Sequence, residues 1–353
     1  MADSATLPAI VAHGASVLPA VELDSYNAEL KDEDSFIGDR ANRRAFCRII
    51  ENWRKPLREQ GDDPFGDEPS EEISKKTFDR MLTKGDAEAA GIVQGAIEDF
   101  SQELALVIRR FLRTKAWKDT ERIVIGGGFV ASRVGEIVVG RTAVILKADD
   151  VDIDLVSIRN DPDEAGLIGA VHLAPRWMFK AHDAIVGIDI GGTNIRAGIV
   201  ELNQKKARDL KKASVADLDL WQHREEGKVS REEAVERLVR MLEKLIAQAK
   251  KKSINLAPFI GIGCPGHIDE DGTIKSGAQN LPGNWESSRF HLPALLHEAI
   301  PRINDEETAI VMHNDAVVQG LSEAPFMTDV SRWGVLTIGT GLGNARFTNR
   351  ESD

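Results

Sequence analysis

The sequence has few cysteines and no long apolar run. Its 353 residues contain two cysteines, Cys47 and Cys264. Two cysteines are too few for a disulfide framework or a cysteine-rich zinc site, so we expect no zinc site and a reducing, cytoplasmic location. No stretch approaches the roughly 18 apolar residues of a membrane span. The N-terminus has no basic residues before its apolar ones, so no membrane association and no signal peptide are predicted.

An excess of positive charge is also missing. Lys and Arg together number 45 against 57 Asp and Glu, a formal net charge of -12. Because binding to nucleic acid requires a basic surface, we predict no nucleic-acid partner. The composition, 42% hydrophobic and 29% charged, is typical of a soluble globular protein, and the length suggests about two domains.

The most informative stretch is 185–200, IVGIDIGGTNIRAGIV, in which two apolar runs flank a glycine turn. The pattern predicts a β-hairpin. Glycines at its turn let backbone N–H groups approach a bulky anion, which indicates a phosphate site, and a neighbouring acid suits Mg²⁺ held through nucleotide. An ordinary hairpin is the alternative. The residues predicted to bind nucleotide here are Asp189, Gly191, Gly192, Thr193, Asn194 and Arg196, with Asp189 as the Mg²⁺ ligand.

Residues 334–347 repeat this layout of strand, glycine turn and strand, with Thr340, Gly341 and Gly343 in the turn. Two such hairpins, each beginning a β-rich unit that continues into helices, predict two similar α/β lobes that face one nucleotide.

The remaining pattern is mixed α/β. Helices are predicted at 40–58, 85–113, 163–174 and 230–252, and strands at 122–125, 142–147, 151–158, 258–263 and 309–312. A further helix is expected to begin at Phe129. Ser230 and Glu233 form a capping box that fixes the start of the helix at 230–252.

Four segments resemble, in this order, the ROK family of sugar kinases and sugar-responsive repressors. They are DIGGTNIRAG (189–198), GIGCPGHIDEDG (261–272) with NLPGNW (280–285), HNDA (313–316) and GTGLGN (339–344). The resemblance covers most of residues 120–350. It implies an α/β fold with two ribonuclease-H-like lobes, as in actin and hexokinase, and a cleft between them.

The resemblance also implies roles. Asp315 would be the general base that accepts the proton of the sugar hydroxyl. Its alternative is a helix N-cap. Asn314, Asn280 and Gly266 would contact the sugar, although Asn280 also fits simple turn chemistry. Thr340, Gly341 and Gly343, with the first hairpin, would clamp the ATP phosphates, and Gly127 and Gly128 would lie on the adenosine side.

The order of the segments departs from the family. The adenosine-side segments, here 123–128 and 165–170, normally follow the second phosphate hairpin, yet they precede the first. The chain is therefore interpreted as circularly permuted, which a fold tolerates when its old termini lie close together. On this interpretation residues 1–165 plus 308–353 form the large lobe and 166–307 the small lobe.

A second departure concerns the sugar. The family's GExGH motif and its cysteine-rich zinc loop are both missing. In permuted order the corresponding region is the N-terminus, where His13 is the nearby histidine and a candidate sugar ligand; a solvated loop histidine is the alternative. The loss of the glutamate leaves the hexose open, with glucose as the first hypothesis.

Three functions are compatible with these patterns. The preferred one is an ATP- and Mg²⁺-dependent hexose kinase that forms a homo-oligomer, a dimer. The second is a sugar-binding regulator or pseudokinase without chemistry. The third is a flavin- or NAD-dependent oxidoreductase, because RIVIGGGFVA (122–131) fits a dinucleotide fingerprint with Asp149 downstream.

Overall fold

The computed structural model describes residues 12–32 and 35–350, which divide into two compact units. Unit 1 holds residues 12–27, 164–331 and 347–350, and unit 2 holds 28–163 and 332–346. Both units are mixed α/β. These bounds differ from the expected lobes, which assigned 12–27, 164–165, 308–331 and 347–350 to the other lobe. The physical reason for the difference at 308–331 is that residues 309–314 form a strand of the unit 1 sheet.

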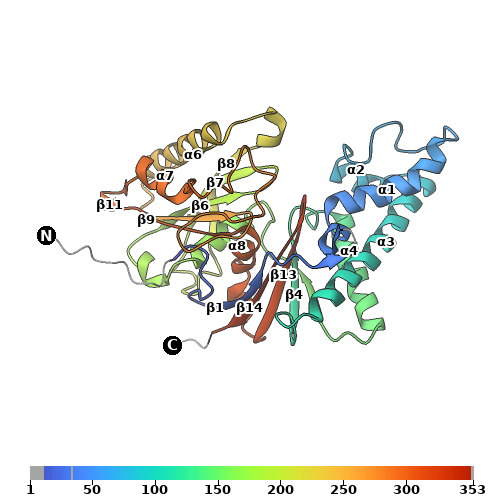
Figure 1. Cartoon of the computed structure of the whole chain (residues 1–353), viewed down its shortest axis with the longest axis horizontal. Coiled ribbons are helices and arrows are strands. Elements are labelled where there is room, and N and C mark those ends of the chain that lie inside the picture. The colour runs from blue at the N-terminus through green and yellow to red at the C-terminus, as the bar shows by residue number, and fades with distance from the viewer. Residues whose placement is uncertain (1–11, 33–34, 351–353) are drawn as a thin grey trace. The chain divides into compact units, whose positions relative to one another are not determined.

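Unit 1 is built on a five-stranded sheet in the order β12-β9-β6-β7-β8 (Figure 1). Its strands are β6 (Ala184–Ile190), β7 (Ile195–Glu201), β8 (Ser214–Trp221), β9 (Leu256–Cys264) and β12 (Ala309–Asn314). β6, β9 and β12 are parallel, whereas β6, β7 and β8 pair antiparallel. The hairpin predicted at 185–200 is thereby confirmed as β6 and β7.

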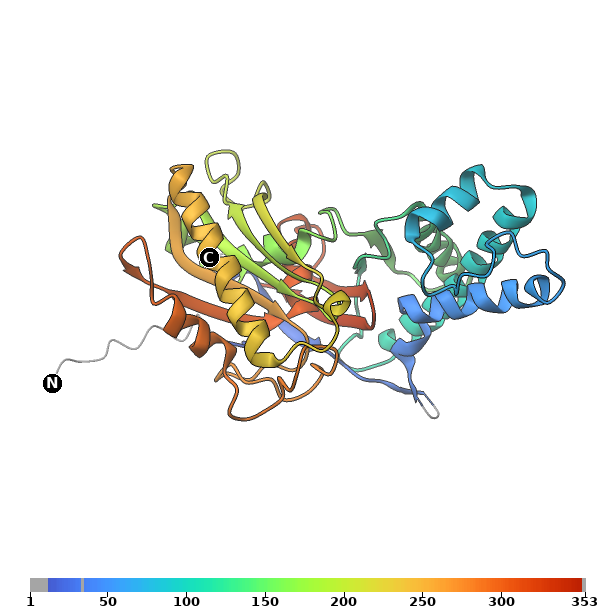
Figure 2. The ribbon, with the colours of Figure 1, turned by 90° about the horizontal axis from the view of Figure 1, so that it is seen from above.

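Helices cover both faces of this sheet. On one face lie α6 (Arg231–Lys251) and α7 (Leu292–Ala299), whose apolar residues share a core with alternate residues of β6 and β7 (Figure 2). α6 begins at Ser230 with the predicted capping box to Glu233. On the other face lie the short helices α5 (Ala165–Gly169) and α8 (Asp315–Leu321). Unit 1 also contains β1 (Val21–Tyr26), β10 (Arg302–Ile303) and β11 (Glu306–Glu307).

The face that carries α5 is packed through glycines. A Cβ added at Gly166 would lie 2.6 Å from Cγ of Asp189, and one at Gly169 would lie 1.7 Å from the backbone oxygen of Val318 in α8. β6 also has a glycine at this contact. A Cβ at Gly187 would lie 3.0 Å from the backbone oxygen of Leu167 in α5. α5 therefore approaches both β6 and α8 at backbone distance.

Unit 2 combines strands with a helical layer. Its helices are α1 (Arg43–Arg58), α2 (Lys75–Lys84), α3 (Ala87–Leu112) and α4 (Arg133–Ala148). Its strands are β2 (Lys31–Asp32), β3 (Ser35–Phe36), β4 (Arg122–Gly126), β5 (Asp154–Ser157), β13 (Arg332–Ile338) and most of β14 (Leu342–Asn349). The second five-stranded sheet has the order β1-β14-β13-β4-β5, with β13, β4 and β5 parallel.

One predicted element is wrong. Residues 142–147 were expected to form a strand, but they continue α4 to Ala148. The buried residues of α4 include Val138, Thr142, Ile145 and Leu146, which recur at helical spacing. They pack against α3, so tertiary packing outweighs the β-propensity of the valines and isoleucine.

The tight packing of α5 leads to a stability prediction. Gly169→Ala places a methyl group against the backbone of α8, and we expect the free energy of unfolding to fall by about 2 kcal/mol or more. Gly140→Ala is the matched control, because a Cβ at this exposed position in α4 would meet nothing within 4 Å. The control should gain about 0.4–1 kcal/mol. Urea unfolding of both variants checks this, and equal stabilities would contradict the described packing.

Candidate functional site

The predicted chemistry of unit 1 gathers at one edge of its sheet. The register pairs Asp189 of β6 with Gly263 of β9, and Cys264 of β9 with Asn314 of β12. Because parallel strands end at the same edge, these residues lie side by side, and Asp315 follows as the first residue of α8. The structure thus brings together two carboxylates, Asp189 and Asp315, that are 126 positions apart in the chain.

Asp315 is not the cap of α8. The cap is Asn314, whose Oδ1 accepts hydrogen bonds from the backbone N–H groups of Ala316 (3.0 Å) and Val317 (3.3 Å). Burial raises the pKa of Asp315 to about 7, and the negative charge of Asp189 adds to this rise. A bond from the N–H of Ala316 lowers it in part. Asp315 therefore changes its charge near neutral pH, where a general base works best.

Asp189 is 3% exposed and faces Arg196 across the hairpin. The Arg196 guanidinium lies 3.6 Å from Oδ2 of Asp189. Two neighbouring carboxylates that repel each other fit a divalent cation, and their oxygens are the donors that Mg²⁺ prefers. Among the described residues no group of three or more His, Cys, Asp or Glu could hold a metal ion. Mg²⁺ bound here would therefore need waters and nucleotide phosphates as its other ligands.

The first glycine turn adjoins the predicted sugar loop. Gly191 N–H donates to the Asn194 carbonyl (2.8 Å), which closes the turn. The carbonyl of Gly191 lies 2.9 Å from Nε2 of His223, and Arg224 N–H donates to the Thr193 carbonyl. A Cβ at Gly192 would lie 3.0 Å from Cβ of Asn280. The turn and Asn280 are thus in direct contact.

Gly266 and Asn314 are also joined. Asn314 Nδ2 donates to the Gly266 carbonyl (2.9 Å), and the side chain of Asn314 is 1% exposed. Gly266 has a φ of +102°, and a Cβ there would lie 2.3 Å from the carbonyl oxygen of Ser276. The loop therefore requires glycine at 266 for its own geometry, and Asn314 holds both this loop and the start of α8.

His13 occupies a different position. Its Nδ1 accepts a hydrogen bond from Met312 N–H (3.1 Å), and Gly14 N–H donates to the Met312 carbonyl, so residues 13 and 14 run along β12. Burial lowers the pKa of His13, and the ring packs near Gly272. Within residues 12–32 and 35–350, no hydrogen bond joins His13 to Asn280, Gly266 or Asp315.

Three aromatic residues beside the site were not singled out from the sequence. Tyr26 stacks on His267 (ring centroids 5.0 Å apart, 1° between planes) and meets His313 edge-on at 5.2 Å. His313 Nδ1 accepts from Asn314 N–H (2.7 Å), so its Nε2 donates to the Ala15 carbonyl (3.1 Å). Burial lowers the pKa of His313 to about 4 and keeps the ring neutral. The sequence signal for this cluster is only that His267 and His313 adjoin Gly266 and Asn314.

Unit 2 brings its own glycine turns together. β4 and β13 are parallel, with Gly126 opposite Thr337, so the turns after both strands lie at one edge. Gly127 has a φ of +83°, and a Cβ there would lie 2.6 Å from the Ile338 carbonyl oxygen. A Cβ at Gly341 would meet nothing within 4 Å. Gly127 and Gly128 therefore adjoin the second hairpin turn, and the space beside Gly341 in that turn is free.

The dinucleotide interpretation does not fit this geometry. Asp149, the acid expected to bind ribose, is the C-cap of α4 and pairs with Arg109. It does not lie at the carboxyl end of β5, where a ribose-binding acid of that fold would be. The apolar strand β4 and its glycine turn therefore need no flavin or NAD.

Comparison with known proteins points to one family. Residues 185–352 match the model of the ROK family. No curated protein matches the chain. None of the helices in the described ranges has both the length and the apolar character that crossing a bilayer demands.

Two solved structures are similar in part. One is a proposed sugar kinase from Cytophaga hutchinsonii, with 21% identity over 47% of this chain and 48% of that chain and a TM-score of 0.36. The other is a proposed N-acetylmannosamine kinase from Listeria monocytogenes, with 21% identity over 47% of each chain and a TM-score of 0.33. The match thus spans about half the length of each of these structures.

The raised pKa of Asp315 predicts a pH-dependent stability. Its carboxyl is neutral in the folded protein up to a pKa of about 7 but ionises near 3.8 when unfolded. Wild-type stability should therefore fall between about pH 4 and pH 7, whereas Asp315→Asn avoids this loss. The advantage of the variant in melting temperature should grow across this range and then level off. Asp62→Asn, at an exposed position, is the control. A difference in melting temperature between Asp315→Asn and wild type that stays constant with pH would contradict the raised pKa of Asp315.

Proposed function

Residues 185–352 carry the ROK-family match, and on this premise we propose that the chain is a sugar kinase that transfers a phosphoryl group from Mg-ATP to a hexose. The acceptor would be a primary hydroxyl, with glucose as the first sugar to test. The observation that carries the proposal is the position of Asp315 at the end of β12, next to Asp189, with a pKa of about 7.

In this mechanism Asp315 accepts the proton of the attacking hydroxyl. Phosphoryl transfer requires mainly positioning and charge stabilisation, with one group that takes this proton. Asn314 fixes Asp315 by capping α8 and fixes the Gly266 loop through its amide. Asn280, beside Gly192, would orient the sugar next to the phosphate turn.

Asp189 would hold the Mg²⁺ of Mg-ATP, and Arg196 beside it would add positive charge. This ion would neutralise the negative charge on the oxygens of the phosphoryl group during its transfer. Gly191, Gly192 and Thr193 would bind phosphate from unit 1. Thr340, Gly341, Gly343, Gly127 and Gly128 would bind nucleotide from unit 2.

We further propose that the fold is a circularly permuted pair of ribonuclease-H-like lobes. Unit 1 has the sheet order β12-β9-β6-β7-β8. Numbered along the chain from β6, these strands lie in the order 5-4-1-2-3. The second sheet has the same order, read from its other edge, when its strands are numbered β13, β14, β1, β4 and β5. Support also comes from the ends of the described chain, because Arg350 N–H donates to the Ala20 carbonyl (3.1 Å). The strand after β14 in this order is thus supplied by the start of the chain.

Two broader expectations belong to the same proposal. Cys47 and Cys264 are both free and buried, which suits a reducing compartment such as the cytoplasm. The homodimer stays a prediction.

The kinase proposal predicts a sugar-dependent activity that requires Asp315. ADP release from Mg-ATP is measured with glucose, fructose, mannose, N-acetylmannosamine and N-acetylglucosamine. Asp315→Ala should lower turnover by about 10²-fold or more on the active sugar, as expected for a positioned base, while sugar affinity remains. Asp62→Ala, an exposed carboxylate away from the strand ends, should retain full turnover.

Near wild-type turnover of Asp315→Ala would refute its role as the base. Silence of the folded wild-type protein across the panel, with sugar binding seen by calorimetry, would instead indicate a sugar-binding regulator or pseudokinase.

The permutation is testable by restoring the family order. Residues 353 and 1 are joined by a Gly/Ser linker of about 15 residues, which spans roughly 20 Å on average. The chain is then opened between Arg176 and Trp177, both exposed in the connector. We expect a folded protein with a melting temperature within a few degrees of wild type. The control is the chain in its original order with the same linker attached at its end. If the control folds and the reordered variant does not, the result would argue against the permutation.

A further inference from the structure

α2 holds the glycine turn after β4 at both ends. Nζ of Lys75 donates to the Gly128 carbonyl at 2.6 Å. One helical turn later, the Asp79 carboxylate accepts from the backbone N–H groups of Arg133 (3.1 Å) and Val134 (3.0 Å). Lys75 and Asp79 lie four residues apart on one face of α2, so a single helix face spans the loop from Gly128 to the start of α4.

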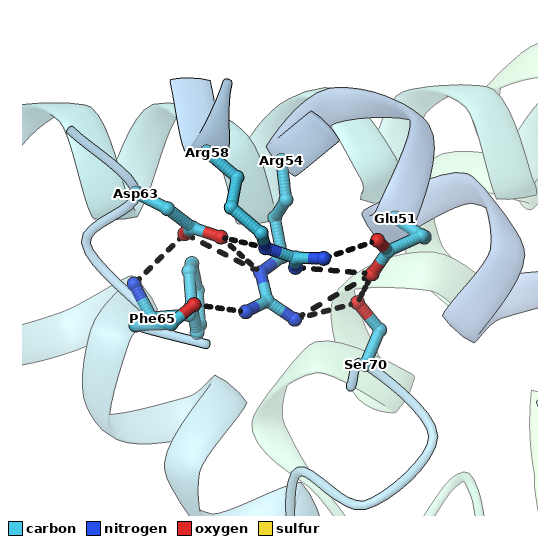
Figure 3. A network of polar contacts seen from close by, with 7 residues as sticks. Glu51, Arg54, Arg58, Asp63, Phe65 and Ser70 are labelled. Atoms are coloured by element: carbon cyan, nitrogen blue, oxygen red, sulfur yellow. Dashed lines mark hydrogen bonds and ion pairs between the residues drawn. The ribbon is translucent and has the colours of Figure 1, made fainter. Parts of the chain in front are cut away.

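A buried arginine fixes the segment that leads into α2 (Figure 3). Arg54 of α1 is 0% exposed. Its guanidinium donates to Asp63 (3.0 Å), Ser70 Oγ (2.8 Å) and the Gly66 carbonyl (3.0 Å). It also lies over the Phe65 ring, 5.2 Å from the centroid. A buried charge is tolerated only when its donors are satisfied, so residues 63–70 are tied to this one side chain.

The same segment adjoins the second glycine turn. Arg43, the first residue of α1, donates its backbone N–H to the Gly339 carbonyl (2.9 Å). Its guanidinium donates to the Glu71 carbonyl (3.3 Å). Arg43 therefore links Glu71, the residue after this segment, to the turn at Gly339. Lys75, at the start of α2, links the same part of the chain to the turn at Gly128.

The charge of Lys75 has no acidic partner in the described part of the chain. Its ammonium has three N–H donors, and one of them bonds to the Gly128 carbonyl. No carboxylate of residues 12–32 or 35–350 forms an ion pair with it, and the residue is exposed. The position places an uncompensated cation directly at the rim of a glycine turn.

We propose that Lys75 is a nucleotide-binding residue whose ammonium contacts a phosphate of the bound nucleotide. This proposal rests on the proposed kinase function and adds to it a cation that the glycine motifs do not include. Lys75 would keep its bond to Gly128 and use its remaining donors for the phosphate oxygens. Arg54 holds the segment that leads into α2, the helix that carries Lys75.

The test measures binding of Mg-ADP, Mg-ATP and adenosine by calorimetry, so that it does not depend on turnover. Lys75→Met should raise the Kd for Mg-ADP and Mg-ATP about tenfold or more, as expected for loss of a charge-assisted hydrogen bond. Its Kd for adenosine should stay unchanged, because adenosine has no phosphate. Lys76→Met is the matched control, an adjacent exposed lysine that should bind all three ligands as the wild type does. Lys75→Arg should recover most of the affinity for Mg-ADP.

Three outcomes would overturn the proposal. Equal Mg-ADP affinity of Lys75→Met and Lys76→Met, with tight wild-type binding, would refute the role of Lys75 and leave the kinase proposal intact. An equal loss for adenosine and Mg-ADP would show that Lys75 only shapes the turn. Absence of nucleotide binding by the folded wild-type protein would refute the kinase proposal and this one together.

Discussion

The site in unit 1 depends on two like charges kept close together. Asp189 lies near the end of β6 and Asp315 follows the parallel strand β12, and the charge of Asp189 adds to burial in raising the pKa of Asp315. The packing around the two carboxylates must offset the unfavourable free energy of this repulsion. Gly166 lets α5 approach Asp189 at backbone distance, and Asn314 fixes the first turn of α8. The charge arrangement that would serve phosphoryl transfer is therefore maintained by helix contacts that themselves bear no charge.

This requirement explains why the two faces of the unit 1 sheet differ. One face carries large apolar side chains that pack against α6 and α7. The other face carries glycines, which allow α5 and α8 to lie close to the strands; these are Gly187, Gly198, Gly261 and Gly263. A conventional apolar layer would separate the helices from the sheet by a side chain. Because α8 lies close to the sheet at Gly263, its first residue, Asp315, is near the ends of β6 and β9.

Sequence patterns predict local features well and long-range contacts poorly. The hairpin at 185–200 and the cap at Ser230 follow from glycine placement and residue spacing, and both are confirmed. The strand predicted at 142–147 is wrong, because β-branched residues there face α3 at helical spacing while Val144 is exposed. Stacking of Tyr26 on His267 joins residues 241 positions apart, and no local pattern encodes it. Arg54 is likewise buried by partners that only the folded loop supplies.

Both units place glycine turns at the carboxyl ends of parallel strands, yet their surroundings differ in charge. The turn at Gly191 follows β6, which carries Asp189 near its end, and Asp315 lies at the same edge. In unit 2 the Gly128 carbonyl accepts a hydrogen bond from the Lys75 ammonium, and the Gly339 carbonyl accepts one from the backbone N–H of Arg43. Backbone N–H groups offer the same donors in every glycine turn, so the neighbouring side chains determine which ligand is preferred. Carboxylates favour a metal ion and a hydroxyl that loses its proton, whereas cations favour phosphate.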